Sequence, residues 1–366
     1  MSRTLGGCSI TSAKALRVLL PATVLLGLSY FAHTVVFDIL FPYINDLNLT
    51  PVVPCPAEYD GSSMYRRQYF GGLLPGLERS LCPLVAFFYP VVQADVKPHY
   101  YREFMIASFS NFSVVVCATF VEASRMQRGL IGPFWILLPV LTGVVYQFIT
   151  GAVTLPYLWT IIIVAQRRGL IKSAPSIDEC DGEGIALGML LGYVVPTYLM
   201  LFHSDIPSIV AWQIFPVIIG AVCGVYILLR PRSNKPSAYN NTIQTTYGIL
   251  FIFLTLINFY FIVSNNFNLT KVINIWFPPF TFRFNSTILQ NFADFSAIVL
   301  QWDLMLIFGG TCLASLWFAK NIKQVLAIAA WYVGPGLLLG PGPAIAAVLM
   351  WREGELRRQN EKIKGE

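Results

Sequence analysis

The sequence carries little charge. Only 12% of its 366 residues are Asp, Glu, Lys or Arg, and 55% are hydrophobic, with a mean hydropathy of +0.62. An average soluble domain carries about 25% charged residues, so these few charges cannot cover a soluble globule. The apolar content also excludes a disordered chain. The apolar residues form continuous runs of about 20, not the alternating pattern of an outer-membrane barrel, and they predict an all-α polytopic membrane protein.

Metal-binding and cofactor-binding patterns are missing. The three histidines, His33, His99 and His203, are too few for the histidine clusters of membrane di-iron hydroxylases and desaturases. No two of the seven cysteines have zinc-type spacing, and neither a phosphate-binding loop nor a dinucleotide fingerprint is present. The aspartate-rich motifs of diphosphate-ionising terpene synthases, soluble protonating cyclases and membrane prenyltransferases are also absent. We therefore expect no cofactor and no metal.

The apolar runs predict a bundle of about eight or nine transmembrane segments, and these form one domain over residues 1–366 with a basic tail at 352–366. Two stretches are unusual. Residues 130–165 are too long for one straight helix and predict a kinked span or a tight pair. Residues 325–351 contain two Gly-Pro-Gly triplets, which predict a broken or re-entrant last segment. The remaining segments are expected at 15–40, 69–93, 101–122, 184–202, 206–229, 245–264 and 295–318.

The loops suggest an orientation. Basic clusters around residues 97–102, 167–172, 230–235 and 320–323 fall on one side if 130–165 is a single span, and the positive-inside rule makes that side cytoplasmic. The loops of the other side hold the glycosylation sequons at Asn48, Asn268 and Asn285, which fits a lumenal face and a multi-pass protein of the endoplasmic reticulum. The net charge of +6 lies in short loops, so we expect no nucleic-acid partner. Cys55 and Cys82 can pair or stay free.

Ionisable residues inside spanning segments are functional candidates because they are costly to insert. In the topology above they lie toward the lumenal ends of their helices, as a shared polar pocket would require. The candidates are Asp38, Glu78, Glu122, His203, Asp205, Asp294 and Asp303.

Each candidate also has a structural interpretation. Asp38 and Asp205 can be helix-end residues in the headgroup zone, and His203 can be an ordinary interfacial side chain. Glu122 and Arg125 can form an (i, i+3) ion pair. Asp303 is the hardest to explain structurally, because it has apolar flanks and no Lys or Arg within a turn.

Aromatic residues are the second half of the pattern. Tyr30, Trp159, Tyr198 and Trp302 lie within or at the ends of the predicted spans, and ring faces stabilise cations. A carboxyl group kept protonated by burial can donate to an epoxide oxygen or an olefin, and a second carboxylate can take the final proton. Aromatic walls and buried carboxyl groups are what carbocation cyclisation needs. The same groups would also serve a proton-coupled transporter.

Several stretches resemble one known family. The polytopic, His-poor and aromatic-rich chain, CATFVEASR around Glu122, LQWD ending at Asp303 and the terminal GPGPAIAAVLMWRE are similar to the larger branch of the fungal integral-membrane terpene cyclases of meroterpenoid and indole-diterpene gene clusters. The resemblance implies a protonation-initiated, redox-neutral cyclisation of a prenylated, farnesyl-type substrate. It also implies that Glu122 and Asp303 are the acid–base pair. Asp38, His203 and Asp205 compete for either role.

Two other functions remain open. The broken last segment is also typical of transporters, which bind substrates at discontinuous helices, so a proton-coupled exporter of a lipophilic metabolite is the first alternative. A non-catalytic membrane scaffold that gathers other pathway enzymes is the second, and the basic tail is its support. The expected partners are a lipophilic prenylated small molecule and the lipid bilayer.

Overall fold

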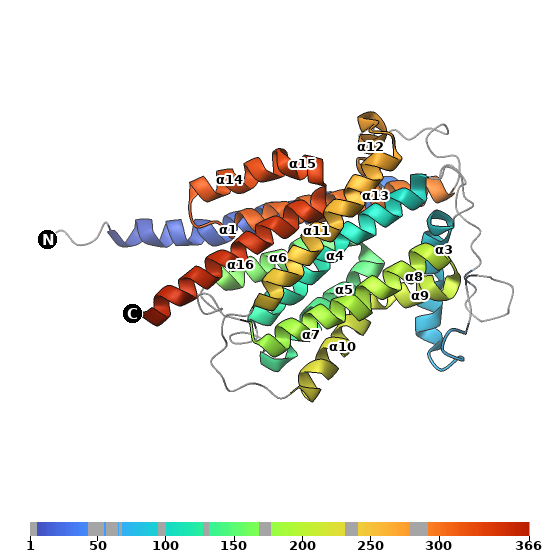
Figure 1. The fold of residues 1–366 in the computed structure, drawn as a ribbon, viewed down its shortest axis with the longest axis horizontal. Coiled ribbons are helices and arrows are strands. Elements are labelled where there is room, and N and C mark those ends of the chain that lie inside the picture. The colour runs from blue at the N-terminus through green and yellow to red at the C-terminus, as the bar shows by residue number, and fades with distance from the viewer. Residues whose placement is uncertain are drawn as a thin grey trace.

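The computed structural model describes residues 6–42, 55, 65, 68–93, 100–126, 132–167, 177–230, 241–278 and 292–365, and this part of the chain contains helices and no strand (Figure 1). In chain order the elements are α1 (Gly6–His33), η1 (Thr34–Leu40), α3 (Pro75–Val92), α4 (Tyr100–Met126), η3 (Gly132–Ile136), α5 (Leu137–Ile149), α6 (Gly151–Arg167), α7 (Glu179–Met189), η4 (Leu190–Val194), α8 (Val195–His203), α9 (Ile206–Gln213), α10 (Phe215–Leu229), α11 (Asn241–Ser264), α12 (Leu269–Trp276), α13 (Phe292–Leu316), α14 (Ile322–Val333), α15 (Pro335–Leu339) and α16 (Pro341–Gly365).

The structure confirms the predicted all-α polytopic fold, with fewer candidate spans in the described residues than the eight or nine predicted. In the described residues, six helical stretches are long and apolar enough to cross a membrane, and α9 with α10, bent by 60°, makes a seventh. The central helix α4 is buried over 89% of its most apolar window. Helix α11 and the α14–α15 stretch are only 22% and 11% buried, which leaves their apolar side chains to face lipid.

The second predicted span does not cross the bundle. Helix α3 lies across one end of the bundle (Figure 1), and its neighbours show why. Phe41, after η1, packs edge-on against Phe295 at the start of α13. Tyr101, at the start of α4, donates a hydrogen bond to Asp294 of the same turn of α13. The chain therefore leaves α1 and enters α4 at the same end, and the prediction of a span at 69–93 was wrong.

The stretch at 130–165 forms a tight pair of helices. Helices α5 and α6 are separated only by Thr150, which has a φ of 77°. Helix α5 begins just after α4 ends, and α6 returns to that end, where Arg167 donates to the carbonyl of Trp317 at 2.7 Å. At 13 and 17 residues the two helices are about 20 and 25 Å long. They form a re-entrant hairpin that turns at mid-depth.

The last segment is broken as predicted. Helix α14 stops before Gly334–Pro335, and the chain reverses at Gly340, whose φ is 93°. Helix α16 then packs back against α15 and α14 (Figure 1). Two buried amides on neighbouring helices bind the freed backbone groups: Asn111 accepts from the Gly342 amide at 2.8 Å, and Asn258 donates to the Leu339 carbonyl at 2.8 Å.

The two ends of the bundle differ in chemistry. The disulfide end holds the starts of α4 and α13, helix α3 with its Cys82 disulfide, and exposed Asn268 after α11. The opposite end, here called the arginine end, holds Arg125, Arg167, Arg230, Lys320 and Arg352 at the ends of α4, α6, α10, α13 and within α16. The start of α1 and the end of α16 also lie there (Figure 1).

Candidate active site

A cavity of about 690 Å³ opens among η1, α3, α4, the α5–α6 turn, α9 and α13. Its wall is aromatic: eleven of its lining residues carry rings. These are Phe37, Phe41, Phe87, Phe88, Phe109, Phe112, Tyr146, Phe148, Trp212, Phe292 and Phe295. The volume suits a ligand the size of a drug molecule or a prenyl chain, and apolar walls with few polar groups are typical of small-molecule sites.

Asp303 is the only carboxylate among the described lining residues. It lies in the fourth turn of α13, about 13 Å deeper than Asp294 at the rise of an ideal helix. Its Oδ1 accepts a hydrogen bond of 2.7 Å from the backbone amide of Ala152, and Thr150 and Gly151 lie beside it. The start of α6 thus holds the carboxyl group, and the positive end of the helix dipole faces it.

The backbone break explains this placement. Within a membrane, non-helical backbone is tolerated where it is buried in protein or lines a cavity. Thr150 and Gly151 line the cavity, and a Cβ at Gly151 would meet Cδ1 of Ile307 at 2.5 Å, so a larger residue there would displace that side chain. The close approach of α6 to α13 brings the amide of Ala152 to Asp303.

Rings from three helices meet in the cavity wall. Trp212, in the last turn of α9, packs with its ring centroid 4.7 Å from that of Phe109 on α4 and 5.1 Å from that of Phe88 on α3. Trp212 lines the cavity two residues before Ile214, where the chain bends by 60° between α9 and α10. Desolvated ring faces of this kind stabilise a positive charge.

Glu122 lies elsewhere, at the arginine end. Its side chain is fully buried, and Arg352 of α16 binds it with both guanidinium nitrogens, one at 2.8 Å. Arg125 lies 3.3 Å from Glu122 and also pairs with Glu353, while Gln166 donates to Glu122 at 3.0 Å. Two anions and two cations thus form a buried ionic cluster that joins α4 and α16.

The predicted pair is therefore not brought together. Glu122 does not line the cavity around Asp303. The prediction that the candidate acids share one depth was also wrong for Glu122. It assumed that 69–93 crosses the membrane, and without that crossing α4 runs in the opposite direction.

The three competing acid–base candidates do not line the cavity either. The side chain of Asp38 is 58% exposed and lies 3.8 Å from His33. His203 is exposed at the end of α8. Asp205 is the N-cap of α9 and accepts from the Ser208 amide at 2.9 Å. Hydrogen bonding from the Ser208 side chain, with a smaller contribution from its amide, lowers the pKa of Asp205. In the described part of the chain, no three His, Cys, Asp or Glu side chains gather closely enough to hold a metal ion.

None of the four predicted pocket aromatics lines the cavity. Tyr30 is 74% exposed and Tyr198 is 56% exposed, both on outward faces of their helices. Trp159 and Trp302 are buried in helix packing, and Trp159 donates to Thr311 at 3.2 Å. Of the rings that do form the wall, Tyr146, Phe148 and Trp212 lie within four residues of the backbone breaks at Thr150 and Ile214, and the sequence offered no signal for the others.

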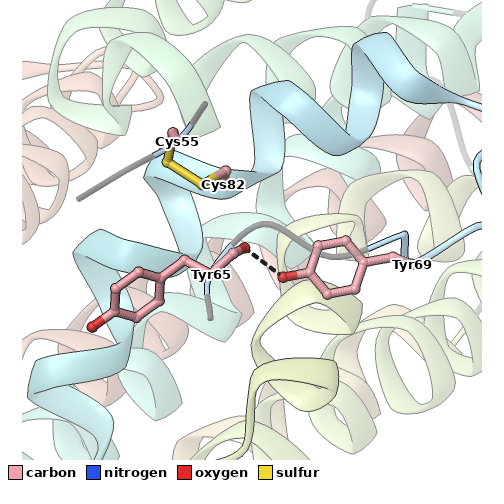
Figure 2. Close-up of a disulfide and its surroundings, with 4 residues drawn as sticks. All are labelled: Cys55, Tyr65, Tyr69 and Cys82. Atoms are coloured by element: carbon pink, nitrogen blue, oxygen red, sulfur yellow. Dashed lines mark hydrogen bonds between the residues drawn. A yellow bond between two sulfur atoms is a disulfide. The ribbon is translucent and has the colours of Figure 1, made fainter. Parts of the chain in front are cut away.

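Cys55 and Cys82 form a disulfide (Figure 2), which resolves the two alternatives. It fixes Cys55 against the cavity, which Cys55 lines together with Phe41 and Phe295. In the same region, Tyr69 donates to the Tyr65 carbonyl at 2.7 Å (Figure 2), and burial raises the pKa of Tyr65. Of the sequons, Asn268 is exposed at the disulfide end, whereas Asn48 and Asn285 lie outside the described residues.

Comparison with known proteins gives two matches. The chain matches the family model of the CtvD domain over residues 21–356. It is also similar to the terpene cyclase ascI of Acremonium egyptiacum, with 24% identity over 342 residues and 84% of each chain covered. No solved structure matches it. The two matches confirm the predicted resemblance to the fungal membrane terpene cyclases.

Proposed function

The chain belongs to the CtvD domain family, and we propose that it is a membrane-bound terpene cyclase in which Asp303 starts ring closure by protonating a prenylated substrate. The observation that carries the proposal is the carboxyl group of Asp303, held by the start of α6 inside an aromatic cavity. Similarity to a protein named as a terpene cyclase supports the same class of reaction.

The protonated carboxyl group of Asp303 gives its proton to an epoxide oxygen or a terminal olefin of a farnesyl-type chain. Opening of the C–O bond, or addition to the C=C bond, leaves a carbon that accepts electrons from a second double bond or a hydroxyl group of the same molecule. A ring bond forms and one proton leaves. No electrons are exchanged, so the product is an isomer of the substrate.

Each part of the cavity has a role in this reaction. The aromatic wall around Trp212, Phe88 and Phe109 stabilises the cationic carbon and keeps water away from it. The amide of Ala152 holds one carboxyl oxygen, so the group keeps one orientation while it loses and regains a proton. Asp303 is the single carboxylate among the described lining residues, and we assign to it both the first donation and the final uptake.

Glu122 receives a structural role in this proposal. Its two oxygens are bound by Arg352, and a third group, Gln166, donates to the same carboxylate. The carboxylate oxygens are thus occupied by groups of the protein itself, and Glu122 lies outside the cavity.

The test uses yeast microsomes that contain the chain. They receive farnesylated phenols with and without a terminal epoxide, and the products are separated by LC–MS. We expect a new isomer of unchanged mass that depends on Asp303. Well-folded protein that forms no isomer from any of these substrates would overturn the proposal and favour a flux assay for transport.

We also propose a multi-pass location in the endoplasmic reticulum, with the arginine end in the cytoplasm. Arg125, Arg167 and Arg230 all lie at that end, as the positive-inside rule requires. The Cys55–Cys82 disulfide and exposed Asn268 lie at the other end, which suits an oxidising lumen. In this orientation Arg125 and the basic residues of α16 also lie on the cytoplasmic side.

A further inference from the structure

One polar group of the cavity has no role in the fold. Gln147 lies in the last turn of α5 and lines the cavity. Its side-chain nitrogen Nε2 is shielded from solvent and has no hydrogen-bond partner among the described residues. Buried amide donors are normally paired, and an unpaired one needs an explanation. Gln147 therefore has N–H donors available to a bound molecule.

The position of Gln147 relative to Asp303 follows from the hairpin. Gln147 lies in the last turn of α5, three residues before the break at Thr150, and both residues line the cavity. Thr150 lies beside the carboxyl group of Asp303, and all three residues line the same cavity. The amide and the carboxyl group thus face one space at the turn, and the rest of the wall is mostly rings and aliphatic side chains.

We infer that Gln147 is a positioning residue, whose amide N–H binds an oxygen atom of the substrate and fixes the adjacent part of the molecule against Asp303. This inference rests on the proposed function for the identity of the acid. An amide donor suits the task because it cannot give up a proton and so does not compete with the acid. The cavity offers few other polar groups, so one such bond sets the direction in which a long apolar chain lies.

The test measures binding, so it does not depend on turnover. The probes are farnesol and a C15 hydrocarbon of the same chain, bound to purified protein in one detergent. The wild-type chain should bind farnesol more tightly than Gln147→Met does, by roughly tenfold, because in the variant the buried farnesol oxygen loses its hydrogen-bond donor. The hydrocarbon should bind both proteins alike. The change in the farnesol-to-hydrocarbon ratio is a readout that a loss of packing alone would not move.

Val145→Met is the control, because Val145 lies on the same helix and is 43% exposed on its outer face. It should keep the wild-type ratio. A Gln147→Met protein that keeps the wild-type ratio would overturn the inference, and it would mean that the donor holds only a buried water. If the ratio changes as expected but microsomes form no isomer, the inference stands and the cyclase proposal fails.

Discussion

Oδ1 of Asp303 accepts a hydrogen bond of 2.7 Å from the backbone amide of Ala152, across 151 residues of sequence. This bond ties the middle of α13 to the first turn of α6. It fixes a carboxyl group at the point where the α5–α6 hairpin turns inside the bundle. The turn that breaks the backbone is therefore also the feature that holds the carboxyl group in the cavity.

Asp303→Asn should abolish isomer formation while the protein remains folded. The amide keeps the shape of the side chain and an oxygen that accepts from Ala152, but it has no acidic proton to give. Turnover is measured in microsomes, and folding by thermal unfolding in detergent. Asp38→Asn is the matched control, because the Asp38 side chain is 58% exposed, and it should retain wild-type activity. An active Asp303→Asn protein would show that another group supplies the proton.

Glu122→Gln should lower the stability of the protein, and it should not change the rate of the reaction per folded molecule. Removing one partner of a buried ion pair costs about 3–5 kcal/mol, because Arg352 and Arg125 then keep uncompensated charge. We expect a large loss of folded protein by size-exclusion chromatography. The control is Glu361→Gln, which breaks the exposed Arg357–Glu361 pair and should cost about 0.3–0.5 kcal/mol at most. A Glu122→Gln protein that is as stable as wild type yet inactive would return Glu122 to the reaction.

Phe112→Leu should slow turnover through loss of a cavity ring. A desolvated cation–π contact is worth about 2 kcal/mol, so we expect kcat to fall by up to roughly thirtyfold, with a changed product distribution. Tyr30→Leu removes a ring that is 74% exposed and should change neither quantity. Equal effects of the two substitutions would contradict the assignment of the aromatic wall.

Cys55→Ser should reduce both thermal stability and activity. The disulfide closes a loop over a sequence separation of 27 residues, and in the chain-entropy treatment such a crosslink contributes about 3–4 kcal/mol. Activity should fall as well because Cys55 lines the cavity. Cys312→Ser, at a free and half-buried cysteine, is the control. Alkylation of Cys55 and Cys82 in the wild-type chain without reductant would show that the bond does not form.

The proposed orientation is tested at both ends. A C-terminal tag on α16 should be digested by protease added to sealed microsomes, since the arginine end faces the cytoplasm. Asn268 is exposed at the other end, and Asn268→Gln should remove one glycosidase-sensitive shift on a gel. A protected tag would reverse the orientation.

The sequence alone determined the class of the protein. Scarce charge and apolar runs of about 20 residues require a helical membrane bundle, because only helices satisfy every backbone group inside a bilayer within one segment. The Gly-Pro-Gly triplets that begin at Gly334 and Gly340 indicated the broken last segment, because broken backbone at membrane depth must be buried in protein or line a cavity. Asp303 was identified as a candidate because an unpaired carboxylate with apolar flanks is costly unless it has a use.

Tertiary structure alone decided which residues meet. Hydropathy cannot distinguish a helix that crosses the bilayer from α3, which lies across an end, and this one difference reverses the direction of α4 and moves Glu122 to the arginine end. Whether a ring faces lipid or a cavity depends on helix rotation and packing, so Tyr30 was predicted in the pocket and Trp212 was not. The contact of Asp303 with Ala152 depends on the close approach of α6 to α13, a non-local distance that no local pattern encodes.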